Sequence, residues 1–184
     1  IGSGRTDAGA HARGQVANFK TESTMSLDDM LEYLNRYLPN DIVVNDIEEV
    51  PERFHSRYNA KEKTYSYNVW NSTIPSVFNG MHSFHYFDEL DMALMEEAAE
   101  KLVGTHDFLA FSALKKSKKS TERTIKEISI TQEGNLIKFS FVGDGFLYNM
   151  VRILMGTLLQ IGSGERPMES IGEALTSRKR EDAG

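Results

Sequence analysis

The stretch Gly4-Arg5-Thr6-Asp7-Ala8-Gly9-Ala10-His11-Ala12 is the most specific part of the 184-residue sequence. It places one carboxylate, Asp7, between an arginine and a second glycine, in a segment built of small residues. Glycine lets the backbone turn tightly or approach a ligand closely, and arginine suits phosphate because its donors form a planar fork. The stretch therefore fits either a site around Asp7 that acts on a nucleotide or a tight turn that Asp7 caps.

The composition is that of an ordinary globular chain, with 40% hydrophobic and 26% charged residues. Cysteine is absent, which excludes a disulfide framework and a thiolate metal site and fits a reducing compartment. No apolar run reaches the roughly 18 residues that a membrane-spanning helix needs. We therefore expect a cytoplasmic protein without a membrane partner.

The charge is unevenly distributed along the chain. The formal net charge is −6, yet residues 115–126 hold six basic residues and one acidic residue. Shorter basic clusters lie within residues 53–63 and at residues 178–180. A charge run is usually a solvated loop, but local positive patches on an acidic body also suit a protein that binds phosphates at chosen places.

Apolar periodicity predicts an alternating order of helices and strands. Helices are expected at residues 27–38, 92–103, 146–161 and 168–177, and strands at residues 42–50, 64–70, 124–131 and 136–142. Ser26 and Asp91 are the expected N-caps of the first two helices, and residues 132–135 the turn of a hairpin. Residues 71–89 read as a loop. This order predicts an α+β fold with a mixed, mostly antiparallel sheet and helices packed on one face.

The helix expected at residues 146–161 is apolar on nearly every side, which predicts that it is buried. Arg152 lies in its middle. A buried guanidinium needs an anionic partner, because it cannot lose its charge. The alternatives are that Arg152 extends to the surface or pairs with a structural acid.

Lys63-Thr64-Tyr65 begins the strand expected at residues 64–70. A strand tyrosine is often a core residue, but a basic and aromatic strand can also stack on bases.

His82 and His85 have the spacing of a metal pair, but no third ligand is evident nearby, so we expect no metal site.

Residues 4–12 resemble the GRTDxGVHA signature of the TruA family of tRNA pseudouridine synthases, from which they depart only at Ala10. Further stretches resemble family motifs in the family's order. These are Arg53-Phe54-His55-Ser56-Arg57, Lys63-Thr64-Tyr65, Gly104-Thr105-His106-Asp107-Phe108, Arg123-Thr124 and Phe146-Leu147-Tyr148-Asn149-Met150-Val151-Arg152. The resemblance covers nearly the whole chain.

The resemblance implies the pseudouridine synthase fold, with residues 1–184 forming one catalytic region. Two α/β subdomains would meet near residues 60–105, with the cleft between them. The implied reaction converts uridine to pseudouridine at positions 38 to 40 of the tRNA anticodon stem-loop, in a homodimer. It needs no cofactor or metal, because no atoms are gained or lost. The family normally has a strand and a helix before the signature and a closing strand after the last residues, so the chain resembles a family member truncated at both ends.

The same resemblance assigns catalytic roles to three residues. Asp7 would attack as a nucleophile or assist removal of a sugar proton, Arg152 would pair with Asp7 and keep it ionised, and Tyr65 would pack on the target base. The residues expected to bind RNA are Arg5, His11, Arg57, Lys63, Lys115, Lys116, Lys118, Lys119 and Arg123. His55 could touch RNA, but we favour a role in a local hydrogen-bond network.

Two other functions compete with this interpretation. One is a module of the same fold that binds structured RNA without turnover. The other is a glycoside hydrolase with Asp7 as its nucleophile, but such enzymes need a second carboxylate, and no convincing partner motif is present.

Overall fold

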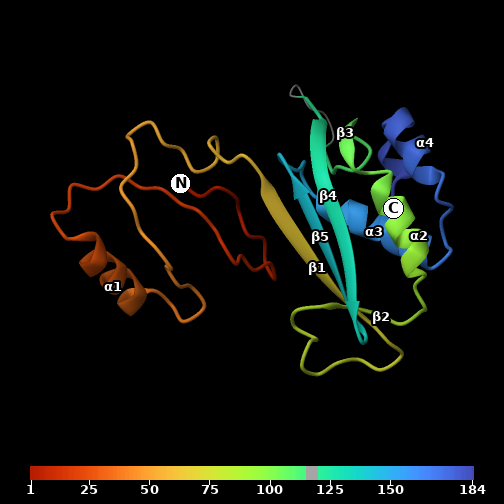
Figure 1. Ribbon diagram of the computed structural model, residues 1–184, viewed down its shortest axis with the longest axis horizontal. Coiled ribbons are helices and arrows are strands. Elements are labelled where there is room, and N and C mark those ends of the chain that lie inside the picture. The colour runs from red at the N-terminus through yellow and green to blue at the C-terminus, as the bar shows by residue number, and fades with distance from the viewer. Residues whose placement is uncertain (115–119) are drawn as a thin grey trace. The chain divides into compact units, whose positions relative to one another are not determined.

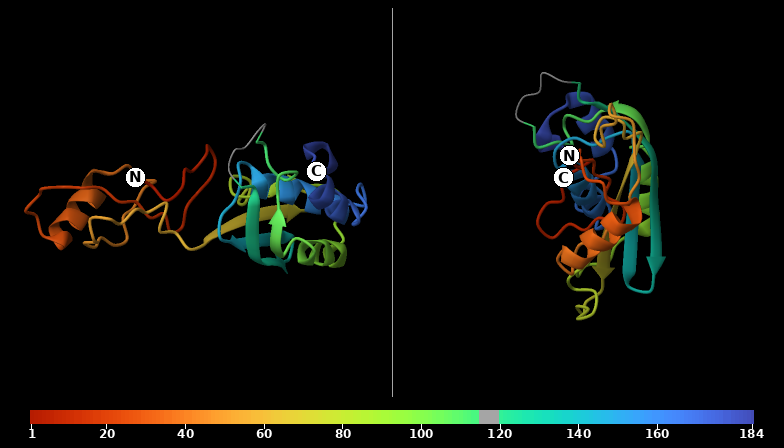
Figure 2. Two further views of the ribbon diagram at one scale, coloured as in Figure 1. Left: turned by 90° about the horizontal axis from the view of Figure 1, so that it is seen from above. Right: turned by 90° about the vertical axis from the view of Figure 1, so that its left-hand side faces the viewer.

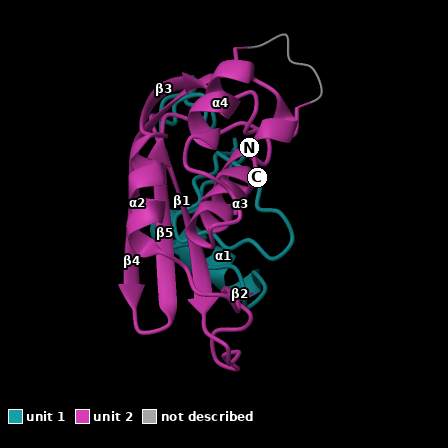
Figure 3. Ribbon diagram, turned by 90° about the vertical axis from the view of Figure 1, so that its right-hand side faces the viewer, with its two compact units in different colours: residues 1–60 teal, residues 61–184 magenta. Residues whose placement is uncertain are grey.

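The computed structural model describes residues 1–114 and 120–184, which divide into two compact units, residues 1–60 and residues 61–184 (Figure 3). The first unit carries the signature stretch with Asp7, and the second carries Tyr65 and Arg152. Four of the residues expected to bind RNA fall outside the described residues, namely Lys115, Lys116, Lys118 and Lys119.

The first unit contains one helix, α1 (Leu27–Tyr37) (Figure 1). As predicted, Ser26 is its N-cap, and its Oγ accepts a hydrogen bond from the backbone N–H of Asp29 at 3.1 Å. Two aspartates in the first turn, Asp28 and Asp29, favour the helix through its dipole. No residue of α1 is buried, so local capping rather than a packed core accounts for where it starts.

The strand predicted at residues 42–50 is wrong, because none of these residues forms a strand. The side-chain amide of Asn35, on α1, takes the place of a strand partner. Its Oδ1 accepts the backbone N–H of Val44, and its Nδ2 donates to the Val44 carbonyl, both at 2.8 Å. The backbone groups of Val44 are thus satisfied by a helix side chain.

The second unit is built on a five-stranded sheet in the order β2-β1-β5-β4-β3. Its strands are β1 (Lys63–Asn71), β2 (Phe84–Tyr86), β3 (Gly104–Asp107), β4 (Glu122–Glu133) and β5 (Leu136–Gly143). β1 and β2 are parallel, and the remaining pairs are antiparallel. The predicted α+β fold with a mixed, mostly antiparallel sheet is confirmed, and so is the β4–β5 hairpin, whose long strands are visible in Figure 2.

Three helices lie on one side of this sheet: α2 (Met92–Glu100), α3 (Met150–Gly162) and α4 (Ser170–Ser177) (Figures 1 and 3). A short 3₁₀ helix, η1 (Arg180–Asp182), follows α4. Alternate residues of β5 contribute to the core, since Ile137, Phe139 and Phe141 are fully buried, and Val69 of β1 and Ile125 of β4 are buried with them. Asp91 caps α2 as predicted, since its Oδ1 accepts the N–H of Leu94 at 3.0 Å.

Two short strands and the start of one helix were not predicted. β2 lies inside the segment expected to be a loop, and β3 follows α2 directly; both are short strands held by pairing with a longer neighbour. α3 begins at Met150 rather than at residue 146, because Asn149 has a left-handed backbone with φ of 59°. Residues 144–149 therefore form a loop that connects β5 to α3.

Candidate functional site

The signature stretch forms a closed loop in the first unit. Its base is an antiparallel bridge between Gly2 and Ala17, flanked by hydrogen bonds from Ser3 N–H to the Val16 carbonyl and from Asn18 N–H to the Ile1 carbonyl, both at 2.8 Å. The segments that flank the signature, residues 1–3 and 16–18, are therefore held together by backbone pairing.

Inside this base, a side-chain amide narrows the loop further. Gln15 accepts the N–H of Gly4 through Oε1 at 3.3 Å and donates through Nε2 to the Gly4 carbonyl at 3.0 Å. At the tip, the N–H of Ala10 donates to the Asp7 carbonyl at 2.9 Å, and Gly9 has a positive φ of 76° that other residues resist. Asp7 thus begins a glycine-dependent turn, and its side chain is exposed.

The motif at residues 53–57 is hydrogen-bonded to the base of this loop. The buried Ser56 donates through Oγ to the Ile1 carbonyl at 2.8 Å, and its N–H donates to Oδ1 of Asn18 at 3.0 Å. Nδ1 of His55 accepts N–H groups of Arg57 and Tyr58 at 3.3 and 3.4 Å. His55 thus completes a local hydrogen-bond network, the role we favoured from the sequence.

In the second unit, Tyr65 lies near the start of β1 and is 43% exposed. Its register partner on β5 is the buried Phe141, so Tyr65 belongs to the face of the sheet that carries the core. Its ring meets the ring of Phe146 edge-to-face, with centroids 5.1 Å apart and planes at 80°. Tyr65 is therefore neither a buried core residue nor a fully solvated one.

Phe146 comes from the loop between β5 and α3, which is fixed to β4. Asp144 donates its N–H to the Thr124 carbonyl, and its Oδ1 accepts the Thr124 N–H, each at 3.1 Å. Gly143 allows this close approach, because a Cβ there would lie 2.9 Å from the Thr124 carbonyl oxygen and 3.1 Å from Cζ of Phe146. Thr124 of the Arg-Thr motif is thus hydrogen-bonded to Asp144, two residues before the motif that begins at Phe146.

Arg152 is exposed, which corrects the expectation that its guanidinium is buried. The helix around it is buried as predicted: ten of the thirteen residues of α3 are buried. The less buried positions Arg152, Gly156 and Gln160 recur every four residues and form one stripe along α3. This stripe was not predictable from the sequence, because Arg152 is the single polar residue in the first two turns of α3.

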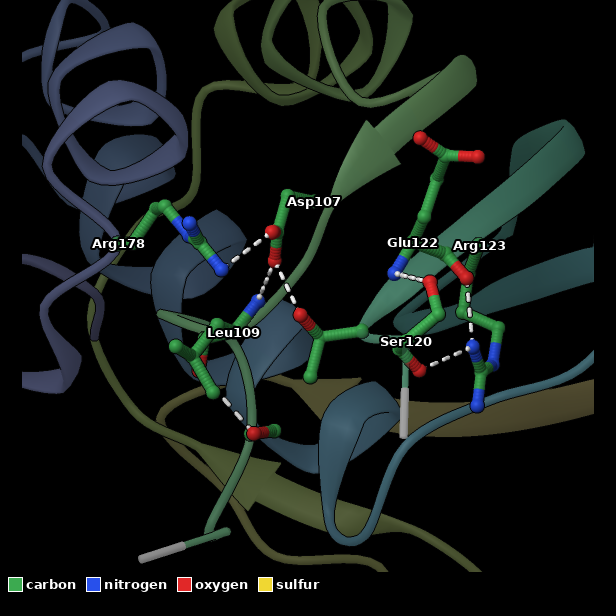
Figure 4. Close-up of polar contacts among 8 residues, drawn as sticks. Asp107, Leu109, Ser120, Glu122, Arg123 and Arg178 are labelled. Atoms are coloured by element: carbon green, nitrogen blue, oxygen red, sulfur yellow. Dashed lines mark hydrogen bonds and ion pairs between the residues drawn. The ribbon is translucent and has the colours of Figure 1, made fainter. Parts of the chain in front are cut away.

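Asp107 is the centre of a polar cluster that the sequence did not single out as functional (Figure 4). Its Oδ1 accepts the hydroxyl of Thr121 at 2.6 Å and the N–H of Leu109 at 3.0 Å, and its Oδ2 pairs with Arg178 at 2.8 Å. Asp107 thus connects the end of β3 to Leu109, to Thr121 and to Arg178 at the end of α4. The sequence signal that could have indicated this cluster was the presence of polar, hydrogen-bonding side chains in the motif at residues 104–108.

The other residues expected to bind RNA are divided between the units. Arg5, His11 and Arg57 are exposed in the first unit, and Lys63 is partly exposed in the second. Arg123, also in the second, directs Nη1 to the backbone carbonyls of Ser120 and Glu122, a local role that the sequence did not indicate (Figure 4).

Residues 1–114 and 120–184 contain no group of three or more histidine, aspartate or glutamate side chains placed to hold a metal ion. Within the same residues, no helix has the length and apolarity to cross a membrane.

Comparison with known proteins identifies the family. The pattern of the family described as tRNA pseudouridine synthase matches residues 1–59 and 98–184. A protein named tRNA pseudouridine synthase A from Bacillus sp. (strain KSM-64) is 49% identical over 184 residues, covering 100% of this chain and 75% of the relative. Proteins of the same name from Acetivibrio thermocellus and Halalkalibacterium halodurans are each 46% identical and are covered over 75% and 69% of their length. The chain belongs to the tRNA pseudouridine synthase family.

Proposed function

We propose that this protein converts uridine to pseudouridine in the anticodon arm of tRNA, at the positions 38 to 40 that the family resemblance implies. The observation that carries this proposal is the 49% identity to a protein named tRNA pseudouridine synthase A over 184 residues, which cover 100% of this chain. The closed loop that bears Asp7 and the half-exposed Tyr65 agree with it, because each presents a functional group on a constrained backbone.

The reaction is an isomerisation within one nucleotide. The bond between N1 of the base and C1′ of the sugar breaks, the base turns, and a bond forms between C5 and C1′. C5 loses a proton and N1 gains one, so the reaction is redox-neutral and needs no co-reactant. The residues must therefore activate C1′, hold the detached base and move a proton.

Asp7 is the proposed activating group. Its exposed carboxylate, at the start of the Gly9 turn, acts either as a nucleophile at C1′ or as a base that removes a sugar proton. Arg152 is proposed to pair with this carboxylate and to set its direction, since a guanidinium binds a carboxylate through two parallel hydrogen bonds. The cleft between the two subdomains would be the place where these groups meet.

Tyr65 is proposed to stack on the target base and to take part in proton transfer at C5. A target uridine must first leave its stack, because C1′ and the base are otherwise out of reach. An exposed aromatic ring gives the extruded base a surface to pack on. Arg5 would fill the gap left by the base or bind a neighbouring phosphate.

Basic side chains are proposed to hold the phosphates of the tRNA. They are Arg5, Arg57, Lys63, Arg123 and the four lysines at 115, 116, 118 and 119, with His11 as an additional contact. We further propose a homodimer that binds tRNA across both subunits in the cytoplasm, in keeping with the family resemblance and the absence of cysteine.

Replacement of Asp7 by alanine tests the proposal directly. On an unmodified tRNA transcript, the wild-type protein should form pseudouridine, detected by mass spectrometry of the nucleosides, and D7A should form none. D7A should bind the transcript almost as well as wild type in a filter-binding assay, because its phosphate contacts remain. D41A is the matched control, since Asp41 is another exposed carboxylate of the first unit, and it should keep wild-type turnover.

The alternative function is RNA binding without turnover. It predicts that the wild-type protein binds the transcript but forms no pseudouridine. Transcripts with cytidine in place of uridine at each of positions 38, 39 and 40 identify the reacting nucleotide. Residual product in D7A would contradict the role of Asp7.

A further inference from the structure

We infer, on the basis of the proposed function, that Phe146 is a positioning residue that fixes the plane of the Tyr65 ring for the target base. Phe146 itself is not assigned a contact with RNA. The inference joins three observations: the ring pair, the weak lateral support of Tyr65 on β1, and the rigid attachment of the loop that carries Phe146.

At Tyr65, β1 is paired with a neighbouring strand on one side. β5 pairs with β1 along residues 63–70, whereas β2 pairs with β1 only from Val69 to Asn71, at the far end. Among the described residues, the strand pairing at Tyr65 therefore comes from β5 alone. A tyrosine ring that is 43% exposed at such a place can occupy several rotamers unless another group holds it.

Phe146 is well placed to supply that restraint. Its ring is half-buried against the core and meets Tyr65 edge-to-face at 5.1 Å and 80°, a geometry that aromatic pairs prefer. An edge-to-face contact fixes the ring plane without covering both faces of the two rings. It therefore restrains Tyr65 in a manner compatible with stacking on a base.

The backbone around Phe146 is unusually constrained. The reciprocal hydrogen bonds between Asp144 and Thr124 attach the loop to β4, and the missing side chain of Gly143 leaves the space that the Phe146 ring fills. The loop then leads into α3, which carries Arg152 six residues later. One short segment thus sets the position of both Phe146 and the helix that bears a proposed catalytic residue.

The test compares Phe146→Leu with Phe84→Leu in the full chain. F146L removes the ring but keeps an apolar side chain. F84L makes the same change at an exposed phenylalanine of β2, whose ring lies 6.3 Å from that of Tyr86.

Two readouts separate positioning from general stability. In turnover of the tRNA transcript, F146L should lower kcat about threefold to tenfold, the range that corresponds to the geometry of one aromatic pair, with KM within about twofold of wild type. In protein labelled with ¹³C-tyrosine, the Tyr65 ring signal, assigned with Tyr65→Phe, should shift in F146L because the ring current of Phe146 is lost. F84L should change neither.

A second variant covers the case in which F146L does not fold. Asp144→Ala removes the carboxylate that accepts the Thr124 N–H, leaves the rings of Tyr65 and Phe146 in place, and should shift the Tyr65 signal and lower kcat by a smaller factor. The inference is overturned if kcat and the Tyr65 signal stay at wild-type values, if F84L gives the same loss, or if the loss appears in KM instead. A wild-type protein without turnover would overturn the proposed function, while the Tyr65 signal would still report on the ring pair.

Discussion

Thr121→Val should destabilise the second unit through the loss of one hydrogen bond to Asp107. Thr121 is only 6% exposed, and its hydroxyl donates to Oδ1 of Asp107 at 2.6 Å (Figure 4). Valine has nearly the same shape but no donor. The substitution therefore leaves the carboxylate with the N–H of Leu109 and the guanidinium of Arg178 and removes its third partner.

The size of the effect follows from the charge and the exposure. A hydrogen bond to a charged group contributes about 1.5–3 kcal/mol to stability. The Asp107 side chain is 31% exposed, so water can replace part of the lost bond and the lower end applies. We expect a loss of about 1.5 kcal/mol, which lowers the melting temperature of a protein of this size by about 4 °C.

The assay is thermal unfolding followed by the fluorescence of Trp70, the single tryptophan, which lies on β1 of the same unit. Thr105→Val is the matched control: its hydroxyl bonds the neutral hydroxyl of Thr124 at 2.9 Å in an exposed position, and its loss should lower stability by less than about 0.5 kcal/mol. In an Asp107→Asn background the effect of T121V should shrink, because the two residues act as a pair. Equal melting temperatures for T121V and T105V would refute the reasoning.

Further predictions concern packing, the signature loop and RNA binding. Gly162→Ala should destabilise by about 1–3 kcal/mol, because its Cβ would lie 2.7 Å from Cγ and Sδ of the buried Met95. Gly172→Ala, with open space around its Cβ, should instead stabilise α4 by up to about 1 kcal/mol; melting curves check both signs. Ser56→Ala removes the hydrogen bond to the Ile1 carbonyl, so amide exchange in residues 1–18 should accelerate about fivefold, corresponding to about 1 kcal/mol. The affinity for tRNA should fall by about tenfold or more between about 50 and about 200 mM salt in a filter-binding titration, and a salt-independent affinity would exclude phosphate contacts as its main source.

Features with a local cause were predictable from the sequence. Ser26 and Asp91 are N-caps in the structure because a short oxygen-bearing side chain before an apolar periodic run satisfies the first N–H groups of a helix. The β4–β5 hairpin was predictable because its two alternating strands are joined by a turn that contains Gly134, with φ of 56°. Each of these signals acts within a few residues.

Features with a distant cause were not predictable. The segment around Val44 has the composition of a strand, but the Asn35 amide satisfies its backbone, and no local pattern reveals that partner. β2 and β3 are too short to show a period, and they exist because β1 and β4 offer them pairing groups. The Asp107 cluster joins residues up to 71 positions apart in the sequence, from Asp107 to Arg178, so spacing alone could not reveal it.

Arg152 is exposed although most of α3 around it is buried. The final residue, Gly184, packs on α3, where its N–H donates to the Thr157 hydroxyl at 2.9 Å and its backbone approaches Gly156. This contact covers the later part of the stripe that Arg152 begins, so burial of α3 and exposure of Arg152 are compatible. Because most of α3 around Arg152 is buried, the backbone that carries the guanidinium is held in place, and we expect the proposed pairing to set the direction of the Asp7 carboxylate toward C1′.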